Sequence, residues 1–405
     1  MPKFLVIQTA FIGDVVLATA IIEKLHTSFP DARIDFLVRK GNEALLAGHP
    51  WLHTVLVWDK KEGKLKNLWR MGRRIRREHY DKVINVQRFA ATGLLTAFSG
   101  AAETIGFDKN PLSRFFSRRI PHIVSAPARG EAPAGRAGGV EQAGAEAVVR
   151  RGEGVEQEVP TKGMAAAAKD VPVPAPLHEI QRNQMLISAF TGDQPARPRL
   201  YPTAADEDKV RPYQQGFYIT VSPASVWFTK QYPKEKWIAF LRLVPEEYTV
   251  YLLGAPSDKE LCEYIKEEVM TQGCGEARPG GAAKAAVPTA AANIINLSGQ
   301  LSFLQSAALM KGAVMNYVND SAPMHFASAV NAPVTAVYCS TIPGFGFGPL
   351  SDEKFIVEIK EPLDCRPCGL HGYKACPRGH FNCAFKIEEG QLLQTLITSR
   401  PVPSR

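Results

Sequence analysis

Strand-length apolar runs alternate with helix-like segments in the first half of the chain, and this alternation constrains the fold more than any other sequence feature. The run at residues 4–8 (FLVIQ) precedes a segment, 14–27, whose apolar residues recur at helical spacing, and a second run follows at 34–38. Further strands are predicted at 54–58 and 83–86. Because β–α–β units build parallel sheets, this half predicts a doubly wound α/β domain.

The second half of the chain repeats the same alternation. Its predicted strands span residues 217–222, 248–253, 313–318 and 333–338. It is preceded by Pro195, Pro198 and Pro202. A proline-rich stretch is typical of a stiff connector. We therefore expect an α/β protein of two Rossmann-like, doubly wound domains, residues 1–192 and 213–405, which are joined by a linker at 193–212 and face each other across a cleft.

Two stretches, residues 126–176 and 273–291, differ in composition from the rest of the chain. The first is rich in Ala, Gly, Pro and Glu and contains no aromatic residue, and the second is rich in Ala and Gly. Such segments cannot bury enough apolar surface to offset the entropy that ordering costs. We therefore expect one low-complexity insertion in each domain.

The size and charge of the chain limit the classes of function. At 405 residues the chain is too long for one ordinary core, which supports two domains. The net charge of +8 favours acidic partners, and nucleic acid, an anionic membrane and phosphorylated sugars all meet that condition. No nucleic-acid-binding motif is recognisable, so no nucleic-acid partner is expected.

The longest apolar run, residues 4–22, has the length of a membrane span but is not predicted to be one. Gln8, Gly13 and Asp14 interrupt it, and a carboxylate at the bilayer centre costs roughly 2.5 to 3.5 kcal/mol. The run also lacks the basic segment and cleavage site of a secretory signal. We therefore expect a cytoplasmic protein with no transmembrane segment. Seven cysteines, an odd number, argue against a disulfide scaffold.

The loop at residues 9–14 (TAFIGD) follows the first predicted strand and holds the first candidate site residue. It lacks the three spaced glycines of a dinucleotide-binding loop, so NAD binding is not predicted. Asp14 stands at the start of the following helix, where a carboxylate can act as a general base or simply cap the helix. The residues alone leave both roles open.

The loop at residues 222–230 (SPASVWFTK) follows the first strand of the second half and carries hydroxyl groups and a lysine. Ser225, Thr229 and Lys230 are therefore candidate contacts for an anionic ligand, because a lysine ammonium suits phosphate oxygens. A solvated surface lysine is the alternative, since Lys234 and Lys236 follow closely.

A third loop, at residues 319–325 (NDSAPMH), joins a predicted strand to an alanine-rich helix. Asp320 or Ser321 can cap that helix, and its free backbone N–H groups can instead bind a diphosphate. His325, one turn into the helix, is either a ligand contact or a buried histidine with internal partners.

Four cysteines form a cluster near the end of the chain. They are Cys365, Cys368, Cys376 and Cys383. Four thiolates can hold a structural zinc ion, but only the first two stand at the usual Cys-x2-Cys spacing, and free or redox-linked thiols are the alternative. Nothing in the sequence indicates a catalytic metal.

In combination and in order, these loops resemble glycosyltransferase family 9, the ADP-heptose:lipopolysaccharide heptosyltransferases. The matching stretches are FLVIQTAFIGDVVLATAII at the start, ASVWFTKQYPKEKW opening the second half, and the segment from NLSGQL to PVTAVY near the end. HEIQRNQML at 178–186 and the cysteine cluster look like the second-heptose branch, heptosyltransferase II. The resemblance covers roughly three quarters of the chain and omits the two insertions.

The resemblance implies a GT-B fold and an inverting transfer that needs no metal. Asp14 matches the family's general base, and Lys230, with Ser225 and Thr229 in the same loop, matches the lysine that contacts the donor phosphates. The family's donor loop is matched by Asp320, Ser321, Ala322 and His325, with alanine where glycine is commoner. The first-heptose branch has a ribose-binding glutamate where this chain has Pro256, so no ribose contact is carried over.

By this resemblance, we expect the chain to transfer a heptose from ADP-heptose to the lipid A-linked inner core of lipopolysaccharide, with no cofactor required. Gly13 and Arg88 are candidate acceptor contacts. Such an acceptor implies a peripheral position on the cytoplasmic face of the inner membrane. The basic residues between 60 and 77 could face membrane phosphates or form a solvated helix. The alternatives are a transferase or epimerase for another nucleotide sugar, and a catalytically silent nucleotide-sugar-binding module.

Overall fold

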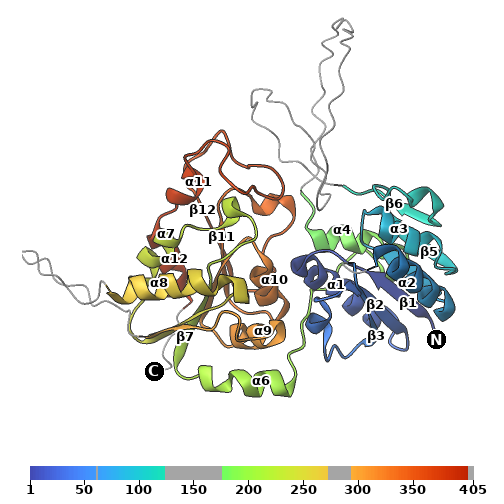
Figure 1. The fold of residues 1–405 in the computed structure, drawn as a ribbon, viewed down its shortest axis with the longest axis horizontal. Helices are drawn as coiled ribbons and strands as arrows, with labels where there is room; N and C mark the ends of the chain where they lie inside the picture. The colour runs from blue at the N-terminus through green and yellow to red at the C-terminus, as the bar shows by residue number, and fades with distance from the viewer. Residues whose placement is uncertain (61–62, 124–175, 272–292, 400–405) are drawn as a thin grey trace, which may run out of the picture.

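The computed structural model describes residues 1–60, 63–123, 176–271 and 293–399, and these form two parallel β-sheets flanked by helices (Figure 1). The N-terminal sheet contains β1 (Lys3–Ile7), β2 (Arg33–Arg39), β3 (Leu52–Trp58), β4 (Lys82–Asn85), β5 (Glu103–Phe107) and β6 (Arg118–Ile120). The C-terminal sheet contains β7 (Phe217–Ser222), β8 (Tyr248–Leu252), β9 (Ile294–Asn296), β10 (Met315–Asn319), β11 (Val334–Tyr338) and β12 (Lys354–Glu358).

The two sheets have the same strand order. It is β3-β2-β1-β4-β5-β6 in the first and, in the matching direction, β9-β8-β7-β10-β11-β12 in the second. In each sheet the first strand is central and the chain winds outward on both sides of it, which is the doubly wound arrangement. The predicted α/β class with two Rossmann-like sheets is therefore confirmed. The carboxyl ends of β1 and β4, and of β7 and β10, are the expected ligand-binding edges.

Helices separate the strands and cover the sheets. The N-terminal sheet is accompanied by α1 (Ile12–Ser28), α2 (Lys64–Glu78), α3 (Ala90–Ala97), α4 (Glu179–Met185) and α5 (Ser188–Thr191). Those that follow are α6 (Ala204–Val210), α7 (Lys234–Leu241), α8 (Lys259–Thr271), α9 (Phe303–Lys311), α10 (Ala322–Ala329), α11 (Asn382–Phe385) and α12 (Glu389–Thr398). Most of the basic stretch between residues 60 and 77 lies in helix α2.

The strands that the sequence predicts occur within one or two residues of their expected ends, whereas β5, β6, β9 and β12 were not predicted. Strands β6 and β9 are only three residues long and close one edge of each sheet, so they carry little apolar pattern. Helix α6 lies inside the predicted linker 193–212, and the domain boundaries remain a prediction. The predicted insertions, 126–176 and 273–291, lie outside the described residues apart from Pro176.

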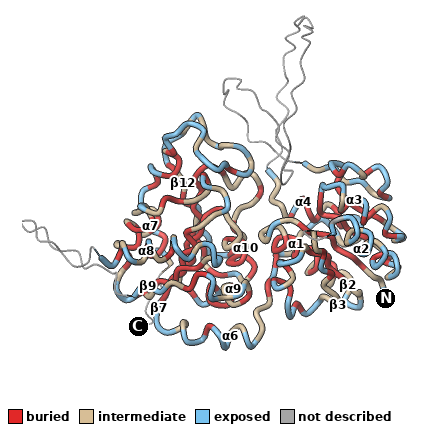
Figure 2. The backbone as a smooth tube through the Cα atoms, in the orientation of Figure 1, coloured by how far each residue is buried: buried red, intermediate tan, exposed pale blue. Residues whose placement is uncertain are grey.

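The two domains meet through helices, and α1 packs directly against α10. One apolar cluster contains Val15 and Ile22 from α1 together with Met324 and Phe326 from α10, and all four side chains are buried. Figure 2 shows buried backbone in both helices where the domains adjoin. The contact therefore fixes how the amino ends of the two helices lie relative to each other.

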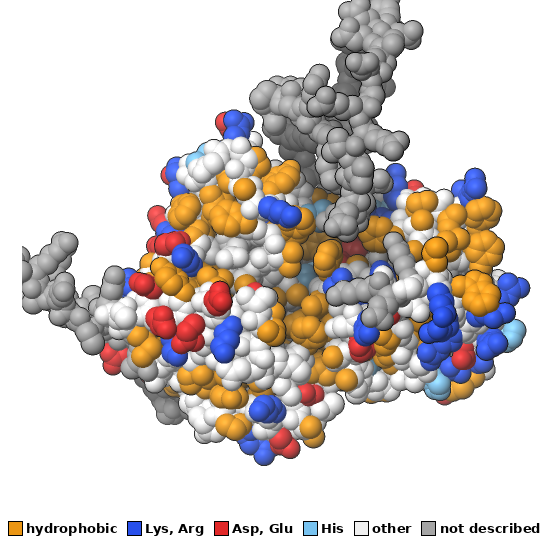
Figure 3. Space-filling view, in the orientation of Figure 1, with side chains coloured by type: hydrophobic (Ala, Val, Ile, Leu, Met, Phe, Trp, Pro, Cys, Tyr) orange, Lys and Arg blue, Asp and Glu red, His pale blue; other side chains and the backbone are white. Residues whose placement is uncertain are grey.

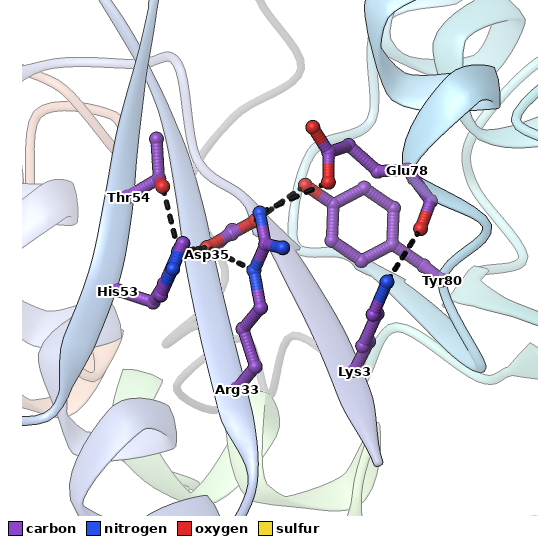
Figure 4. A network of polar contacts seen from close by, with 7 residues as sticks. All are labelled: Lys3, Arg33, Asp35, His53, Thr54, Glu78 and Tyr80. Atoms are coloured by element: carbon purple, nitrogen blue, oxygen red, sulfur yellow. Dashed lines mark hydrogen bonds and ion pairs between the residues drawn. The ribbon is translucent and has the colours of Figure 1, made fainter. Parts of the chain in front are cut away.

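A polar network centred on the buried Asp35 joins β2 to β3 and to the segment between α2 and β4, away from the carboxyl edge of the sheet (Figure 4). The Asp35 carboxylate accepts hydrogen bonds from the Tyr80 hydroxyl at 2.7 Å and from Arg33 at 3.0 Å, and the ring of His53 lies 3.2 Å away. Arg33 also bonds the Glu78 carboxylate at 2.9 Å. Burial, reinforced by the Asp35 carboxylate, raises the pKa of Tyr80, which keeps its hydroxyl a donor. The network supports the sheet and leaves the opposite edge to the site.

Candidate functional site

The amino ends of α1 and α10 face each other across the junction of the two domains. Gly13, in the first turn of α1, lies so close to α10 that a Cβ atom there would be 2.8 Å from Cδ2 of His325 and 3.9 Å from Cα of Ala322. Both helices start just beyond a central strand, β1 or β10. Their amino ends carry unpaired N–H groups and positive dipole ends, so the junction suits an anionic ligand.

Gly13→Ala is expected to lower both the melting temperature and the turnover number, the latter by at least about tenfold, because the new methyl group pushes the His325 ring away. Melting curves and steady-state rates measure the two effects. Gly390→Ala is the matched control, since it adds a methyl group to a helix with open space around it. Equal effects of the two substitutions would mean that α1 and α10 do not need this close approach.

Asp14 lies in the first turn of α1, partly exposed in this junction. Burial raises the pKa of Asp14 to about 6, and the Glu179 carboxylate adds to the rise. A hydrogen bond from the backbone of Phe11, together with Arg88 and Lys230, acts in the opposite direction. Phe11 is the N-cap residue of α1, so Asp14 does not occupy the N-cap position itself. A carboxyl group with this pKa can accept a proton near neutral pH, as a general base must.

Lys230 approaches the same junction from the C-terminal domain. It ends the short 3-10 helix Phe228–Lys230 beyond β7, and its Nζ lies 2.6 Å from the Asp320 carboxylate. The Thr341 hydroxyl donates to the same carboxylate at 2.6 Å. The side chains of Lys230 and Asp320 are 16% and 8% exposed, so Lys230 is not the solvated surface lysine of the alternative interpretation. Its ammonium is instead held near Asp14 by a carboxylate from the loop after β10.

The donor-loop residues surround the start of α10. Ser321 is the N-cap residue, its backbone is extended, and its side chain makes no capping hydrogen bond. His325 is buried, and its Nδ1 atom has no partner among the described residues. Burial lowers the pKa of His325 to about 3, with His178 and Lys230 adding to the effect, so the ring is neutral. A neutral ring with an unused nitrogen remains able to hydrogen-bond a ligand.

Asn319 holds the loop that contains Ser225. Its side-chain amide donates to the carbonyl of Pro223 at 2.8 Å, and its oxygen accepts the N–H of Tyr232 at 2.9 Å. Ser225 is partly exposed between these two fixed points. The sequence placed Asn319 in the donor loop but gave it no role. The structure makes Asn319 a second link between the two donor-side loops, beside the Lys230–Asp320 ion pair.

The segment 371–373, inside the cysteine cluster, forms another wall of the site that sequence reasoning missed. The Thr229 hydroxyl accepts the N–H of Tyr373 at 2.7 Å, and a Cβ atom at Gly372 would lie 2.9 Å from Cγ of Lys230. Burial lowers the pKa of His371, with Lys230 and Arg88 adding to the effect, so this ring lies among the cations of both domains. Thr229 is buried and holds this segment, and its predicted donor contact stays a prediction.

The cysteine cluster does not form a metal site. All four of its cysteines are described and carry free thiols, and no group of three or more His, Cys, Asp or Glu side chains within the described ranges is arranged to hold a metal ion. Cys368 donates its S–H to the carbonyl of Cys365, and Sγ of Cys365 lies 3.8 Å from Nε2 of His380. The structure therefore gives no support to zinc, and the free-thiol alternative agrees with it.

Helix α4 clamps the glycine-rich loop that follows β11. The backbone N–H of Glu179 donates to the carbonyl of Gly346 at 2.8 Å, and Arg182 donates to the carbonyl of Phe345 at 3.1 Å. His178 donates from Nε2 to the carbonyl of Gly348 at 3.0 Å. Arg182 also holds the Glu179 carboxylate at 2.8 Å. The motif HEIQRNQML thus connects the domains and places a second carboxylate near Asp14.

Arg88 follows β4 and is exposed. Its charge lowers the pKa of both Asp14 and His371, which places it at the junction from the N-terminal side. Gly13 and Arg88 therefore lie beside the candidate base, as an acceptor contact must, and their binding roles remain predictions.

Comparison with known proteins assigns the arrangement to a family. Residues 145–370 match the profile described as "Glycosyltransferase family 9 (heptosyltransferase)", which covers more than half of the chain. The chain belongs to glycosyltransferase family 9. It is therefore a glycosyltransferase enzyme. Lipopolysaccharide heptosyltransferase 2 of Escherichia coli K12 is 22% identical to this family 9 chain over 361 residues, 88% of each protein. Lipopolysaccharide heptosyltransferase 1 of Pseudomonas aeruginosa is 23% identical over 386 residues, 90% of this chain and 86% of the relative.

Solved structures of other family members have the same fold as this glycosyltransferase. The family 9 protein of Veillonella parvula superposes with a TM-score of 0.71 at 16% identity, over 98% of this chain and 97% of that one. ADP-heptose lipopolysaccharide heptosyltransferase II of E. coli superposes with a TM-score of 0.67 at 17% identity, over 98% of both chains. The predicted GT-B fold is confirmed. No helix in the described part of the chain is long and apolar enough to cross a bilayer.

Proposed function

We propose that this family 9 enzyme transfers a heptose from ADP-heptose to the inner core of lipopolysaccharide, with inversion at the anomeric carbon. The observation that carries the proposal is the meeting of Asp14 with Lys230 and the amino end of α10 in one junction between the domains. The named relatives, which are lipopolysaccharide heptosyltransferases, support the sugar and the acceptor.

The reaction is a single displacement. An acceptor hydroxyl attacks carbon 1 of the heptose from the face opposite the ADP, the C–O bond to the diphosphate breaks, and Asp14 takes the hydroxyl proton. Lys230 and the N–H groups at the start of α10 stabilise the negative charge that grows on the departing ADP. Asp320 holds the Lys230 ammonium in place until phosphate oxygens share it. Gly13 and Arg88 lie where they could contact the acceptor.

Two neutral histidines lie at the junction where we place the donor. The pKa of His325 falls to about 3 and that of His178 to about 4, mainly because both rings are buried. Neither ring adds a positive charge at neutral pH, so Lys230 and the α10 dipole supply the attraction for the diphosphate. We assign His325, Ser321, Ala322 and Ser225 to donor binding. A lipid-linked acceptor would also bring the protein to the cytoplasmic face of the inner membrane.

An ADP-release assay tests the proposal, with purified ADP-heptose and a panel of truncated core glycolipids as acceptors. Release that depends on one of these acceptors is the expected result. If ADP raises the melting temperature but no acceptor in the panel leads to ADP release, the protein is instead a silent binding module. Stronger stabilisation by UDP than by ADP would indicate a different nucleotide sugar.

The pH dependence of kcat/KM is expected to rise through an inflection near pH 6 and level off above it, because Asp14 must be ionised to act as the base. Glu179→Gln should move the inflection to lower pH, since the Glu179 carboxylate raises the pKa of Asp14. Rate profiles of both proteins between about pH 5 and 8 measure the shift. An inflection that stays in place after this substitution would separate Glu179 from the base.

A further inference from the structure

The outer side of the N-terminal domain exposes large apolar side chains on three neighbouring elements. Leu65 and Trp69 of α2 are 81% and 62% exposed. Phe98, at the end of α3, is 62% exposed, and Phe115, in the 3-10 helix Ser113–Phe115, is 54% exposed. Side chains of this size are normally buried, so a group of them at the surface indicates a binding surface. We call these residues, with the arginines described next, the basic-aromatic surface.

Arginines accompany the apolar side chains. The guanidinium of Arg73 lies 3.8 Å from the centre of the Trp69 ring, and that of Arg114 lies 4.7 Å from the Phe115 ring. Further exposed arginines of the surface are Arg70, Arg74, Arg76, Arg77 and Arg119. None of these seven arginines forms an ion pair with another described residue. Their charge is therefore available to an anionic partner.

The three elements form one continuous surface. Gly72 of α2 faces Leu95 of α3, and Gly100, just after α3, lies against Arg76. Leu65 and Trp69 belong to the same helical row as Gly72 and Arg76, so they project from the side of α2 that borders α3. Helix α3 in turn packs on the segment before Phe115. Figure 3 shows hydrophobic and basic side chains interspersed over this end of the domain.

The position and extent of the basic-aromatic surface indicate which kind of partner it binds. Helix α3 begins directly after β4, so the exposed Phe89 and Arg88 connect the surface to the rim of the junction that holds Asp14. Arginines next to aromatic rings suit the boundary of a bilayer, where guanidinium groups meet lipid phosphates and rings enter the interface. The surface spans three elements on the outside of the domain, as contact with an extended anionic plane requires.

We infer that the basic-aromatic surface docks this enzyme on an anionic phospholipid bilayer, next to the lipid-linked acceptor. The inference rests on the proposed function, because that function puts the acceptor in a membrane. Docking through α2 and α3 would bring the rim at Phe89 close to the lipid headgroups, so that an acceptor core could reach Asp14 without leaving its bilayer.

Co-sedimentation of the full chain with vesicles tests the docking. We expect binding to vesicles of phosphatidylcholine mixed with phosphatidylglycerol, weakening as salt is added, and little binding to phosphatidylcholine alone. The triple variant Arg70→Glu, Arg73→Glu, Arg74→Glu should lose at least about a hundredfold in partitioning, since each basic residue at such a surface contributes about fivefold. Trp69→Phe should remove most of the tryptophan quenching that brominated lipids cause in the parent.

A matched variant controls for net charge. Lys209→Glu, Arg211→Glu, Lys360→Glu reverses three exposed charges in the other half of the chain and should bind anionic vesicles as the parent does. All variants should turn over a deacylated, soluble acceptor at the parent rate, so failure of the proposed transfer would show in the parent and is separate from failure of docking. Equal vesicle binding by the two triple variants, or a parent without preference for anionic vesicles, would overturn the inference.

Discussion

Asp14→Asn is expected to lower the turnover number at least a hundredfold while leaving the affinity for ADP-heptose within about twofold, because only proton transfer is lost. Asparagine has the shape of aspartate, and its side-chain oxygen can still accept the hydrogen bond from the Phe11 backbone. It cannot take a proton from the acceptor. Steady-state ADP release and a donor titration of the same preparation measure the two quantities.

The same variant has an expected effect on stability that depends on pH. The pKa of Asp14 is about 6 in the folded protein and about 3.9 in an unfolded chain, so folding favours the protonated form. Protonated Asp14 therefore contributes to the free energy of unfolding below about pH 4. This contribution falls as the pH rises from about 4 to 6 and is lost above pH 6. At pH 8 the ionised carboxylate lowers that free energy by about 2 to 3 kcal/mol, a cost that asparagine avoids.

Asp14→Asn should therefore melt at a higher temperature than the parent at pH 8 and at nearly the same temperature at pH 4. Asp31→Asn, at an exposed position, is the control for the change of residue type. A variant with turnover within tenfold of the parent and no gain in stability at pH 8 would return Asp14 to the role of a residue that only supports the first turn of α1.

The sheets were predictable because parallel strands covered on both faces must be apolar throughout. Strands such as β1, β7 and β10 are buried along nearly their whole length, and the sequence shows each as an uninterrupted or nearly uninterrupted apolar run. Strands β6 and β9 have three residues each and lie at sheet edges, where charge and exposure remove the pattern. The limit is physical: the longer edge strand β3 was predicted from its own side chains, whereas three residues are too few to show a pattern, and such a strand is specified more by its neighbour's free hydrogen-bonding groups.

The site was predictable only in its parts. The loops after β1, β7 and β10 pointed to Asp14, Lys230 and Asp320 separately, because ligands bind at the carboxyl ends of parallel strands. The sequence gave no sign that Lys230 pairs with Asp320, ninety positions away. Nor did it place His371 and Glu179 beside them, since only the packing of the cysteine segment and of α4 brings these residues in. The sequence analysis singled out both stretches for other reasons: HEIQRNQML for its resemblance to the second-heptose branch, and the cysteine segment as a possible zinc site as well.

Lys230→Ala is expected to weaken binding of ADP-heptose by about a hundredfold and to slow transfer as well, because a charged hydrogen bond to the diphosphate is lost both in the bound state and in the transition state. Calorimetric titration gives the first quantity and single-turnover ADP release the second. Lys234→Ala, four residues further on at the start of α7, is the matched control and should change neither.

The substitution also leaves the buried Asp320 carboxylate without its ion pair, and among the described residues the Thr341 hydroxyl is then its one remaining side-chain partner, which by itself can destabilise the fold. The double variant Lys230→Ala, Asp320→Asn removes that unpaired charge, so it should recover stability without recovering donor affinity. The pH profile of the residual activity tests the interaction between Lys230 and Asp14. Because Lys230 lowers the pKa of Asp14, the inflection of kcat/KM in Lys230→Ala should lie above pH 6. Parent-like donor affinity with an unmoved inflection would confine Lys230 to its ion pair with Asp320 and would leave the diphosphate to the amino end of α10 alone.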